Sequence, residues 1–584
     1  MTKTQNTIDN PMENKNIRIW CANSQEHLDV TPGTTLGEVA ERLHIELRDE
    51  KTGRTLPVLA ALVDHRLKEL SYPLVMSHEV EFIGCNHAEG RRTYIRSLCF
   101  VLQKAARDLF PDSTLVIDHS LPSGLYCELK EKDPVNGHHP VRPVGEEEVR
   151  RLGDRMRAIV AADLPFTKTK VRAEEAIALF EGQGQPHKAE LLRSLGECTV
   201  SIYALDGVQD TFYGPLAPST ACLDGFALSL FAEGFCLRLP DIRNPLAVKP
   251  MEKQDKIAAA LSEYSRWCDI IGVTGAGSLN RAILSGHAVD VINISEAMHS
   301  RKYAAIADEI SRQRDRIRIV LIAGPSSSGK TSSSLRIALE CRTLGLTPKV
   351  IELDNYFVDR EKTPRDENGE YDFEHLHAMD LDLLGRQLNQ LLAGEEVETP
   401  VFDFKKGARS GTGKRMRLEK DDILIMEGIH ALNPEMTSAV DDSRILRVYV
   451  SALTSLNLDE NNHISTSDNR LLRRLVRDNR VRGITPEETL LRWHSVRRGE
   501  SRNIFPFQEN ADVIFNSALA FELPALKYYA EPLLRRILPN SPAYTEAVRL
   551  LKFLRCVTAL QPSEIQAIPP TSILREFLGG QTLS

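Results

Sequence analysis

The feature that most limits the possible folds of this chain is a glycine-rich loop between an apolar run and a helix-like stretch. The apolar run is IRIVLIA at 317–323, the loop is GPSSSGKT at 324–331, and the next stretch is SSSLRIALECRTLG. An uninterrupted apolar run is typical of a strand buried on both faces of a parallel sheet. The order strand, G-x-x-x-x-G-K-[ST], helix predicts a phosphate-binding loop. The alternative, a serine-glycine turn that matches by chance, does not account for the strand before it and the helix after it.

Each part of this loop has a chemical role in holding a nucleotide. Gly324 and Gly329 let the backbone wrap around a phosphate, and the free N–H groups and dipole of the helix start attract negative charge. Lys330 reaches the β- and γ-phosphates, and the Thr331 hydroxyl can ligate Mg²⁺. The predicted nucleotide-binding residues are Gly324, Pro325, Ser326, Ser327, Ser328, Gly329, Lys330, Thr331 and Ser332. The motif alone predicts nucleotide binding and leaves the reaction open.

Two further apolar runs end in acidic residues. DDILIMEGIHAL at 421–432 predicts a buried strand with Glu427 at its end, where a carboxylate can orient Mg²⁺ or its water shell. VIELDNYF at 350–357 predicts a strand that ends in Asp354. Ligands of parallel sheets bind beyond the carboxyl ends of the strands, so Asp354 could accept a proton from an attacking hydroxyl. The alternatives are a solvent-facing Glu427 and a turn-forming Asp354 before Asn355.

An arginine-rich stretch, DNRLLRRLVRDNRVRG at 468–483, predicts a helix with several guanidinium groups on one face. These residues are Arg470, Arg473, Arg474, Arg477 and Arg480. One interpretation is a solvated helix whose ion pairs use Asp468 and Asp478. A second is a lid that neutralises charge on a transferring phosphoryl group. The basic density would also suit RNA.

Taken in order, the motifs of the second half resemble the uridine kinase and phosphoribulokinase family over about 316–520. The resemblance rests on GPSSSGKT, LDNYF, YDFEHLHAMD at 371–380, PVFDF at 400–404, MEGIHAL, DNRLLRRLVRD and QENADVIFN at 508–516. It implies an α/β P-loop kinase that transfers the γ-phosphate of ATP, with Mg²⁺, to a sugar hydroxyl. The 5′-hydroxyl of a nucleoside is the expected acceptor. A non-nucleoside sugar or sugar phosphate is the alternative.

The same resemblance implies roles for individual residues. Asp354 is the expected catalytic base, supported by Lys330, Arg474 and Arg477, and Mg²⁺ is expected at Thr331 and Glu427. The expected acceptor-binding residues are Asp354, Tyr356, Glu374, Phe402 and Arg470. Glu374 stands where uridine kinases carry an Asp that holds the ribose hydroxyls.

The pattern also departs from uridine kinases at the base-reading positions. Phe402 replaces a tyrosine, and ungapped counting puts Gly407 at a histidine position. Selectivity for uracil or cytosine therefore does not follow from the resemblance.

The first half carries a different resemblance, over about 16–245. LDVTPGTTLGEVAERL and VLAALVDHRLKELSYPL resemble the β-grasp TGS domain, and RRTYIRSLCFVLQKAARDLFP and DTFYGPLAP resemble the second, editing-like domain of threonyl-tRNA synthetases. That domain carries histidine and cysteine residues where this chain has Arg96, Phe100, Phe212 and Leu216. Metal binding and editing need imidazoles or thiols there. We expect a regulatory, RNA-sensing or oligomerising module, and the competing function is an RNA- or ribosome-associated ATP switch.

Length and composition set the remaining limits. A chain of 584 residues is too long for one core. We expect a disordered segment at 1–15, a TGS-like domain at 16–85, an α+β synthetase-like domain at 86–249, a helical connector at 250–315, the kinase domain at 316–540 and a helical tail at 541–584.

Charge, cysteines and hydropathy indicate where such a chain works. The net charge of -8 argues against gripping nucleic acid as the main task. No CxxC pair, apolar run of membrane-spanning length or secretory signal occurs, so we expect a cytoplasmic protein without a membrane anchor. A homo-oligomer is also expected.

Overall fold

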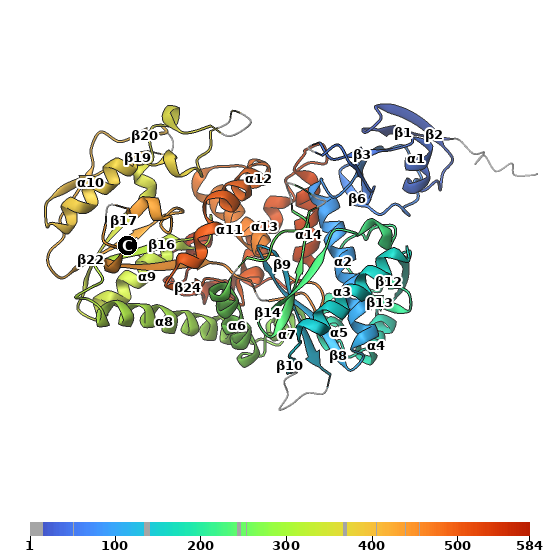
Figure 1. Cartoon of the computed structure of the whole chain (residues 1–584), viewed down its shortest axis with the longest axis horizontal. Coiled ribbons are helices and arrows are strands. Elements are labelled where there is room, and N and C mark those ends of the chain that lie inside the picture. Colours follow the sequence, from blue (N-terminus) through green and yellow to red (C-terminus); the bar gives the residue numbers. More distant parts are fainter. Residues whose placement is uncertain are drawn as a thin grey trace, which may run out of the picture.

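The computed structural model describes residues 16–50, 52–132, 140–241, 244, 247–252, 254–365, 369, 371–403, 406–438, 440–454 and 456–583. The segment 1–15, expected to be disordered, lies outside these residues. Figure 1 shows the front half of the chain on one side of the molecule and the phosphate-loop half on the other, with α14 (Tyr544–Arg555) between them. None of the helices in the described ranges is long and apolar enough to cross a membrane.

The first unit is a mixed sheet covered by one helix. Its strands have the order β2-β1-β7-β5-β6, in which β1 and β7 are parallel and the other neighbours are antiparallel. Helix α1 (Leu36–Arg42) begins at Thr35, whose hydroxyl accepts a hydrogen bond from the Glu38 N–H at 3.3 Å. The strands are β1 (Ile17–Cys21), β2 (Glu26–Val30), β5 (Ala60–Val63), β6 (Arg66–Lys68) and β7 (Glu79–Ile83), with a small hairpin of β3 (Leu47–Arg48) and β4 (Thr55–Leu56) beside them.

The second unit combines two sheets with four helices in the described residues. Long helix α2 (Ala88–Leu109) and α3 (Glu146–Ala161) pack with a sheet made of β8 (Ser113–Leu121), β9 (Gly124–Glu131), β10 (Val141–Arg142), β14 (Ala227–Phe231) and β15 (Gly234–Arg238). A smaller sheet and its helices contain β11 (Thr167–Arg172), β12 (Thr199–Leu205), β13 (Val208–Asp210), α4 (Ala173–Gly182) and α5 (Pro186–Leu195).

The second half of the chain is built on a parallel sheet with β16 (Ile319–Ala323) at its centre. All five residues of β16 are buried, as the apolar run predicts. Within the described residues the strand order is β17-β22-β16-β23-β24, and every neighbouring pair is parallel. The other strands are β17 (Thr347–Glu352), β22 (Asp422–Glu427), β23 (Ile445–Ser451) and β24 (Val513–Asn516). Glu427 therefore pairs with Ile322 and Glu352 at the carboxyl edge of the sheet.

Helices cover this sheet, and short strand pairs lie beside it. The expected strand at 350–357 ends at Glu352, and Asp354 instead lies in a 3-10 turn, Leu353–Tyr356. The helices are α9 (Lys330–Thr343), α10 (Leu381–Leu392), α11 (Thr466–Arg477), α12 (Pro486–Asn503) and α13 (Glu522–Leu534), and the strand pairs are β18 (Val397–Thr399) with β21 (Lys414–Met416) and β19 (Phe402–Asp403) with β20 (Ala408–Arg409).

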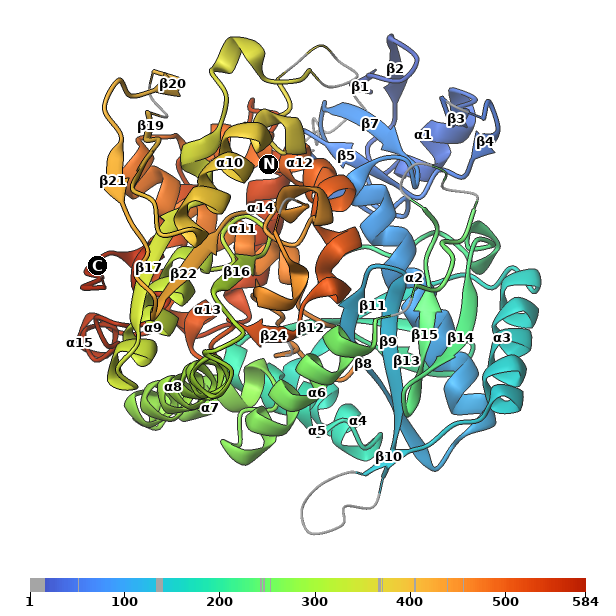
Figure 2. The ribbon, with the colours of Figure 1, turned by 60° about the vertical axis from the view of Figure 1, so that its left-hand side comes forward.

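The connector and the tail pack into the same core as the parallel sheet. Tyr303, Leu550 and Phe577 are buried in one apolar cluster with Val320 of β16. Figure 2 shows the last residues returning to the side of α9. The connector helices are α6 (Asp255–Ile270), α7 (Ala276–Leu284) and α8 (Ala288–Arg312), and the tail contains α14 (Tyr544–Arg555), α15 (Pro562–Gln566) and α16 (Arg575–Leu578).

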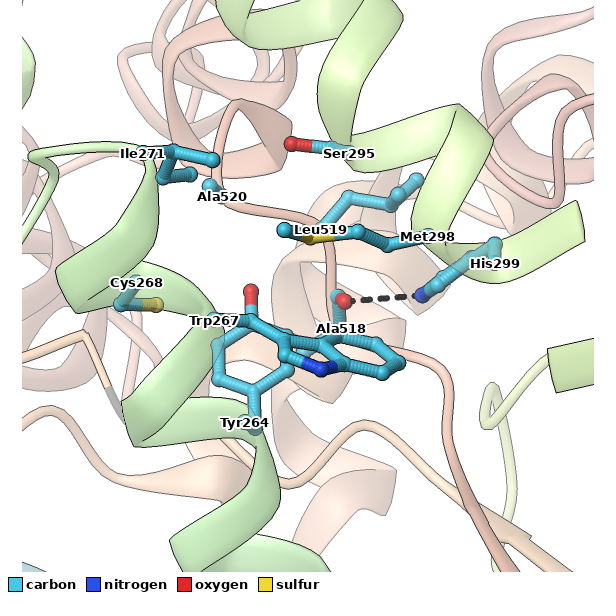
Figure 3. A pocket seen from close by; sticks show the side chains of 10 residues that line it. All are labelled: Tyr264, Trp267, Cys268, Ile271, Ser295, Met298, His299, Ala518, Leu519 and Ala520. Carbon is cyan, nitrogen blue, oxygen red and sulfur yellow. Dashed lines mark hydrogen bonds between the residues drawn. The ribbon is translucent and has the colours of Figure 1, made fainter. Parts of the chain in front are cut away.

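A small hollow lies between α6, α8 and the loop after β24 (Figure 3). Its volume is about 10 Å³, room for about one water molecule. At its edge, a His299 ring nitrogen lies 3.1 Å from the Ala518 carbonyl, and burial lowers the pKa of His299 to about 3. The hollow is too small to be a substrate site.

The loop 456–463, between β23 and α11, docks into the front half. The Ile117 N–H donates to the Glu460 carbonyl at 2.8 Å, and the Asn461 side chain donates to the Leu115 carbonyl at 3.0 Å. Lys188 of α5 is fully buried and pairs with Asp210 of β13. The two halves are therefore joined by buried polar contacts at the loop that leads into α11.

Candidate phosphate-transfer site

The glycine-rich loop has the backbone that its sequence predicts. β16 ends at Ala323 and α9 begins at Lys330, so the loop lies between a buried strand and a helix N-terminus. Gly329 has φ 89°, a left-handed conformation that glycine adopts without strain. A side chain at Gly324 would collide with the Val450 carbonyl of the neighbouring strand. Both glycines are therefore needed for this loop shape.

Arginine residues of α11 hold the loop by donating hydrogen bonds to its backbone carbonyls. Arg470 donates to the Ser326 carbonyl at 3.0 Å, and Arg473 donates to the Ser328 carbonyl at 3.3 Å. Both guanidinium groups are buried and paired, Arg470 with Glu500 at 2.8 Å and Arg473 with Glu522. A buried charge is tolerated when it is paired and hydrogen-bonded in this way.

The contacts of Arg470, Arg474 and Arg477 can be compared with the roles that the sequence predicts for them. Arg470, expected to contact the acceptor, lies under the loop and is only 1% exposed. Arg474 donates to the Ser326 hydroxyl at 2.9 Å. Arg477 pairs with buried Asp478, which also lies 3.2 Å from Arg474. Arg474 therefore contacts the loop, Arg477 lies near enough to Asp354 to act on its pKa, and Arg470 positions the loop.

The acidic residues at the sheet edge gather around Thr331 and Lys330. The Thr331 hydroxyl donates to Glu427 at 2.7 Å. Burial raises the pKa of Glu427 to about 7; Lys330 opposes this shift, and Asp354 adds to it. Burial also raises the pKa of Asp354, against the positive charges of Lys330, Arg482 and Arg477. The site thus concentrates buried negative charge that a cation would stabilise.

The residues present fit a nucleotide with Mg²⁺. The buried hydroxyls of Ser327 and Ser328 have no hydrogen-bond partner in the described structure, and such groups can serve a phosphate. No cluster of three or more metal-ligating side chains occurs in the described ranges. Mg²⁺ usually takes one or two protein oxygens and completes its shell with phosphate and water, so Thr331 and Glu427 suit it.

The predicted acceptor residues fall into two groups. Tyr356 is a core residue, 1% exposed, whose hydroxyl donates to Gln387 at 2.8 Å. Glu374 lies against α12 at Gly499, and burial raises its pKa to about 7, with Arg474 opposing the shift. Phe402, half-buried, begins β19 with its ring 5.9 Å from that of Phe357. Glu374 and Phe402 are partly exposed, whereas Tyr356 is buried in the turn that carries Asp354.

The β19–β20 hairpin carries Phe402 and Gly407, the two positions at which the sequence departs from uridine kinases. Gly407 has φ 69°, and Arg409 donates to Asp380 at 3.0 Å and to the Tyr356 carbonyl at 2.9 Å. Arg409 thus anchors the hairpin to the Asp354 turn. Lys406 is exposed, and Lys405 lies outside the described residues. The Arg409 side chain therefore fixes the hairpin to the site.

Several residues at the site carry no sequence signal of their role. Glu500 and Glu522 neutralise the buried arginines from 30 and 49 residues away. Arg482 returns toward Asp354 because a π-helical turn, Asp478–Arg482, follows α11. Glu576 of the tail bonds to Ser332 of the loop helix at 2.6 Å. Of the features of the π-helical turn, only its end has a sign in the sequence, which is Gly483 directly after Arg482.

The altered positions of the synthetase-like domain form an apolar contact. The rings of Phe100 and Phe212 lie 5.1 Å apart, and Leu216 is buried in the same cluster. Arg96 donates to the Pro215 carbonyl at 2.6 Å. Apolar packing of Phe100, Phe212 and Leu216, and the contact of Arg96 with a backbone carbonyl, therefore occupy the positions where the synthetase domain carries histidine and cysteine.

A parallel sheet of this strand order, with a glycine-rich phosphate loop between β16 and α9 and acidic residues at the ends of the flanking strands, defines a P-loop kinase. The sequence model of the phosphoribulokinase/uridine kinase family matches residues 319–522. Uridine kinase from Halobacterium salinarum is 30% identical over 194 residues, which cover 33% of this chain and 77% of that protein. The chain belongs to the phosphoribulokinase/uridine kinase family, and the predicted fold class is confirmed.

The front of the chain is similar to a different group of proteins. Threonine–tRNA ligase from Desulforamulus reducens is 29% identical over 204 residues, 35% of this chain and 30% of the ligase. The chain spans about a third of the length of these ligases. The solved structure of a possible uridine kinase from Bacillus stearothermophilus has 19% identity and a TM-score of 0.25, covering 36% of this chain and 96% of that one.

Proposed function

We propose that this protein is an ATP-dependent nucleoside kinase, which transfers the γ-phosphate of ATP to the 5′-hydroxyl of a nucleoside. The observation that carries the proposal is the gathering of Asp354, Lys330 and the Thr331–Glu427 pair at one edge of the sheet. A base, a phosphate-binding cation and a magnesium-binding pair are the parts that phosphoryl transfer requires.

The residues divide the reaction between them. The loop N–H groups and Lys330 hold the phosphates, and Thr331 and Glu427 would hold Mg²⁺, which supplies positive charge that neutralises the phosphate oxygens. The acceptor hydroxyl attacks the γ-phosphorus in line, the bond to the ADP oxygen breaks, and the hydroxyl proton passes to Asp354. Most of the rate enhancement comes from positioning and electrostatics, because this transfer needs little covalent help.

Asp354→Asn tests the base directly. The amide keeps the shape of the side chain but accepts no proton, so phosphorylation should fall steeply while ATP affinity changes little. A variant that loses ATP affinity, with normal chemistry for each bound substrate, would show that Asp354 binds metal or supports the fold instead. Lys349→Met, a change on β17, the strand that leads into the Asp354 turn, is the control, because Lys349 lies toward the other end of that strand.

The acceptor is proposed to be a nucleoside read mainly through its ribose. Glu374 can accept hydrogen bonds from ribose hydroxyls, and Phe402 can stack on any base without selecting its edge. An apolar contact discriminates weakly, by roughly 10- to 200-fold for a methylene-sized difference. Comparing kcat/KM for uridine, cytidine, adenosine, guanosine, inosine, free sugars and sugar phosphates tests this. Selectivity above about a thousandfold for pyrimidine nucleosides, or turnover of sugars alone, would contradict it.

A basic groove supports RNA contact as a second candidate function of the front half. The groove has a volume of about 360 Å³ between β6 and α14 and is lined by Arg66, Lys68, Arg535, Lys552 and Arg555, with no carboxylate among its described lining residues. Burial and neighbouring positive charges lower the pKa of Lys68 and of Lys552. Clustered cations of this kind bind phosphate backbones.

The RNA candidate has its own test. Lys68→Glu combined with Lys552→Glu should weaken tRNA binding and reduce the slope of log affinity against log salt by about two. Lys170→Glu, a change at an exposed lysine of β11 that does not line the groove, makes the same kind of charge change. Equal tRNA affinity of the groove variant and the control would rule the groove out. RNA-stimulated ATP use without an acceptor would favour the ATP switch.

The cytoplasmic location and the homo-oligomer remain predictions. Light scattering of the purified chain measures the oligomeric state.

A further inference from the structure

The last residues of the chain contact the start of the phosphate-loop helix. Ser332 donates its hydroxyl to a Glu576 carboxylate oxygen at 2.6 Å and its N–H to the same oxygen at 3.4 Å. The Gln581 amide donates to the Ser332 hydroxyl at 2.8 Å. Figures 1 and 2 both place the C-terminus beside α9. The family match ends at residue 522, so this contact comes from outside the matched region.

The segment 573–581, called here the C-terminal strap, is firmly docked. Ile573 and Phe577 are buried, and Ile573 packs against Gly329 of the loop. Arg480 donates to the Glu576 carbonyl at 2.9 Å and to the Phe577 carbonyl at 3.1 Å. Arg473, which holds the loop, also lies 5.1 Å from the centre of the Phe577 ring. The strap is therefore tied to the same elements that position the phosphate loop.

Ser332 lies at the start of α9, where a helix favours an anion. Ser332 is the third residue of α9, so its N–H is one of the free donors at the helix start that favour an anion. Asp354 and the Thr331–Glu427 pair mark the end of the site where the transferred phosphate lies. With the transferred phosphate at that end, the rest of a bound nucleotide would extend past the helix start at Ser332. The Glu576 carboxylate already accepts hydrogen bonds from the Ser332 N–H and hydroxyl.

We propose that the C-terminal strap competes with the nucleotide, with Glu576 standing in the place of the α-phosphate. This inference rests on the proposed function, because it assigns ATP to the loop. Like charges repel, so Glu576 cannot keep its position when a phosphate takes the Ser332 donors. Nucleotide binding then requires the strap to move away from α9, and the strap lowers the apparent affinity for ATP.

Glu576→Gln tests the competition while preserving the size of the side chain. A glutamine holds the Ser332 donors less strongly than a carboxylate, because hydrogen bonds to a charged acceptor are about twice as strong as neutral ones, so the ADP Kd and the KM for ATP should fall by about tenfold. The value of kcat should change less than about twofold, because Glu576 bonds to Ser332 and leaves that place when nucleotide is bound. Glu564→Gln is the matched control, because Glu564 caps α15 at the Gln561 N–H and a glutamine can still do so.

Hydrogen exchange of the full chain gives a second, independent measurement. The Gly579 N–H donates to the Arg575 carbonyl at 2.8 Å, and the Leu578 N–H donates to the Leu574 carbonyl at 3.0 Å. Saturating ADP should speed exchange in the strap. Slower exchange with ADP, or nucleotide binding that is unchanged or weaker in Glu576→Gln, would overturn this proposal alone. No ATP or ADP binding by either the wild type or the folded variant would refute the proposed function as well.

Discussion

Replacing Lys188 by methionine should loosen the front half from the kinase half. Lys188 is 0% exposed; its ammonium group pairs with Asp210, lies 3.6 Å from Asp459 and donates to Asn461 at 3.2 Å. Methionine fills a similar volume but leaves two buried carboxylates without their cation. Removing one partner of a buried ion pair costs about 3–5 kcal/mol.

Hydrogen exchange at the docked loop reports this loss. The Ile117 N–H bonds to the Glu460 carbonyl at 2.8 Å across the contact, so it exchanges when the halves separate locally. A cost of about 3–5 kcal/mol corresponds to exchange that is faster by about two to nearly four orders of magnitude at roughly 1.36 kcal/mol per factor of ten. Catalytic turnover should fall as well, because the loop leads into α11, whose arginines hold the phosphate loop.

The pH dependence of the Lys188→Met variant follows from the buried acids. Burial raises the pKa of Asp210, and Lys188 opposes that shift, so losing Lys188 raises this pKa further. A carboxyl with a raised folded pKa contributes stability that is present below its unfolded pKa of about 3.9 and is lost as pH rises through the folded pKa. The deficit relative to the wild type should therefore shrink as pH falls from about 8 to 5.

Two comparisons decide whether the reasoning holds. Lys168→Met removes a partly exposed pair with Glu69 at 2.7 Å and should cost no more than about 1 kcal/mol. Adding Asp210→Asn to Lys188→Met should recover part of the loss, because it removes one unpaired charge. Exchange at Ile117 that is equally fast in Lys188→Met and Lys168→Met would refute the claim that this network holds the halves together.

Three further predictions concern the two halves separately. Lys330→Ala should lower kcat by about a hundredfold or more, because the substitution removes the positive charge that stabilises the transferring phosphate. The circular dichroism spectrum should not change, and near-normal turnover would contradict the assignment. Because the pKa of Glu427 is about 7, the Mg²⁺ affinity of the ATP complex should weaken as pH falls from about 8 to 6. Glu427→Gln should bind Mg²⁺ weakly at every pH, and a pH-independent wild type would refute the role. Metal analysis of the full chain should find no stoichiometric zinc, because Phe100, Phe212 and Leu216 offer no zinc ligand; one zinc per chain would contradict this.

Sequence analysis succeeded where neighbouring residues carry the information. The run before Gly324 predicts β16, the glycines predict the loop, and Lys330 begins α9 as the motif requires. Strand, loop and helix follow each other within about thirty residues, so local propensity and the phosphate-binding pattern agree. The order of motifs was enough to predict the family, and the family match confirms it.

The arginine-rich helix shows what local pattern leaves open. Helical spacing predicts that Arg470, Arg473 and Arg474 lie near one another, but it does not predict whether their side chains are buried or exposed. Their partners Glu500 and Glu522 lie 30 and 49 residues away, so the choice between a solvated helix and a buried clamp depended on tertiary packing. Charge by itself does not tell whether a guanidinium group faces water or a carboxylate.

By itself the sequence determined the class of the kinase half, the glycine-rich loop and the two resemblances, because each depends on short motifs of consecutive residues. Only the tertiary structure decided that loop 456–463 enters the front half and that Glu576 meets Ser332, 244 residues away along the chain. Contacts of such separation depend on how whole units pack. Burial at the sheet edge raises the pKa of Glu427, and burial beside the docked loop raises the pKa of Asp210.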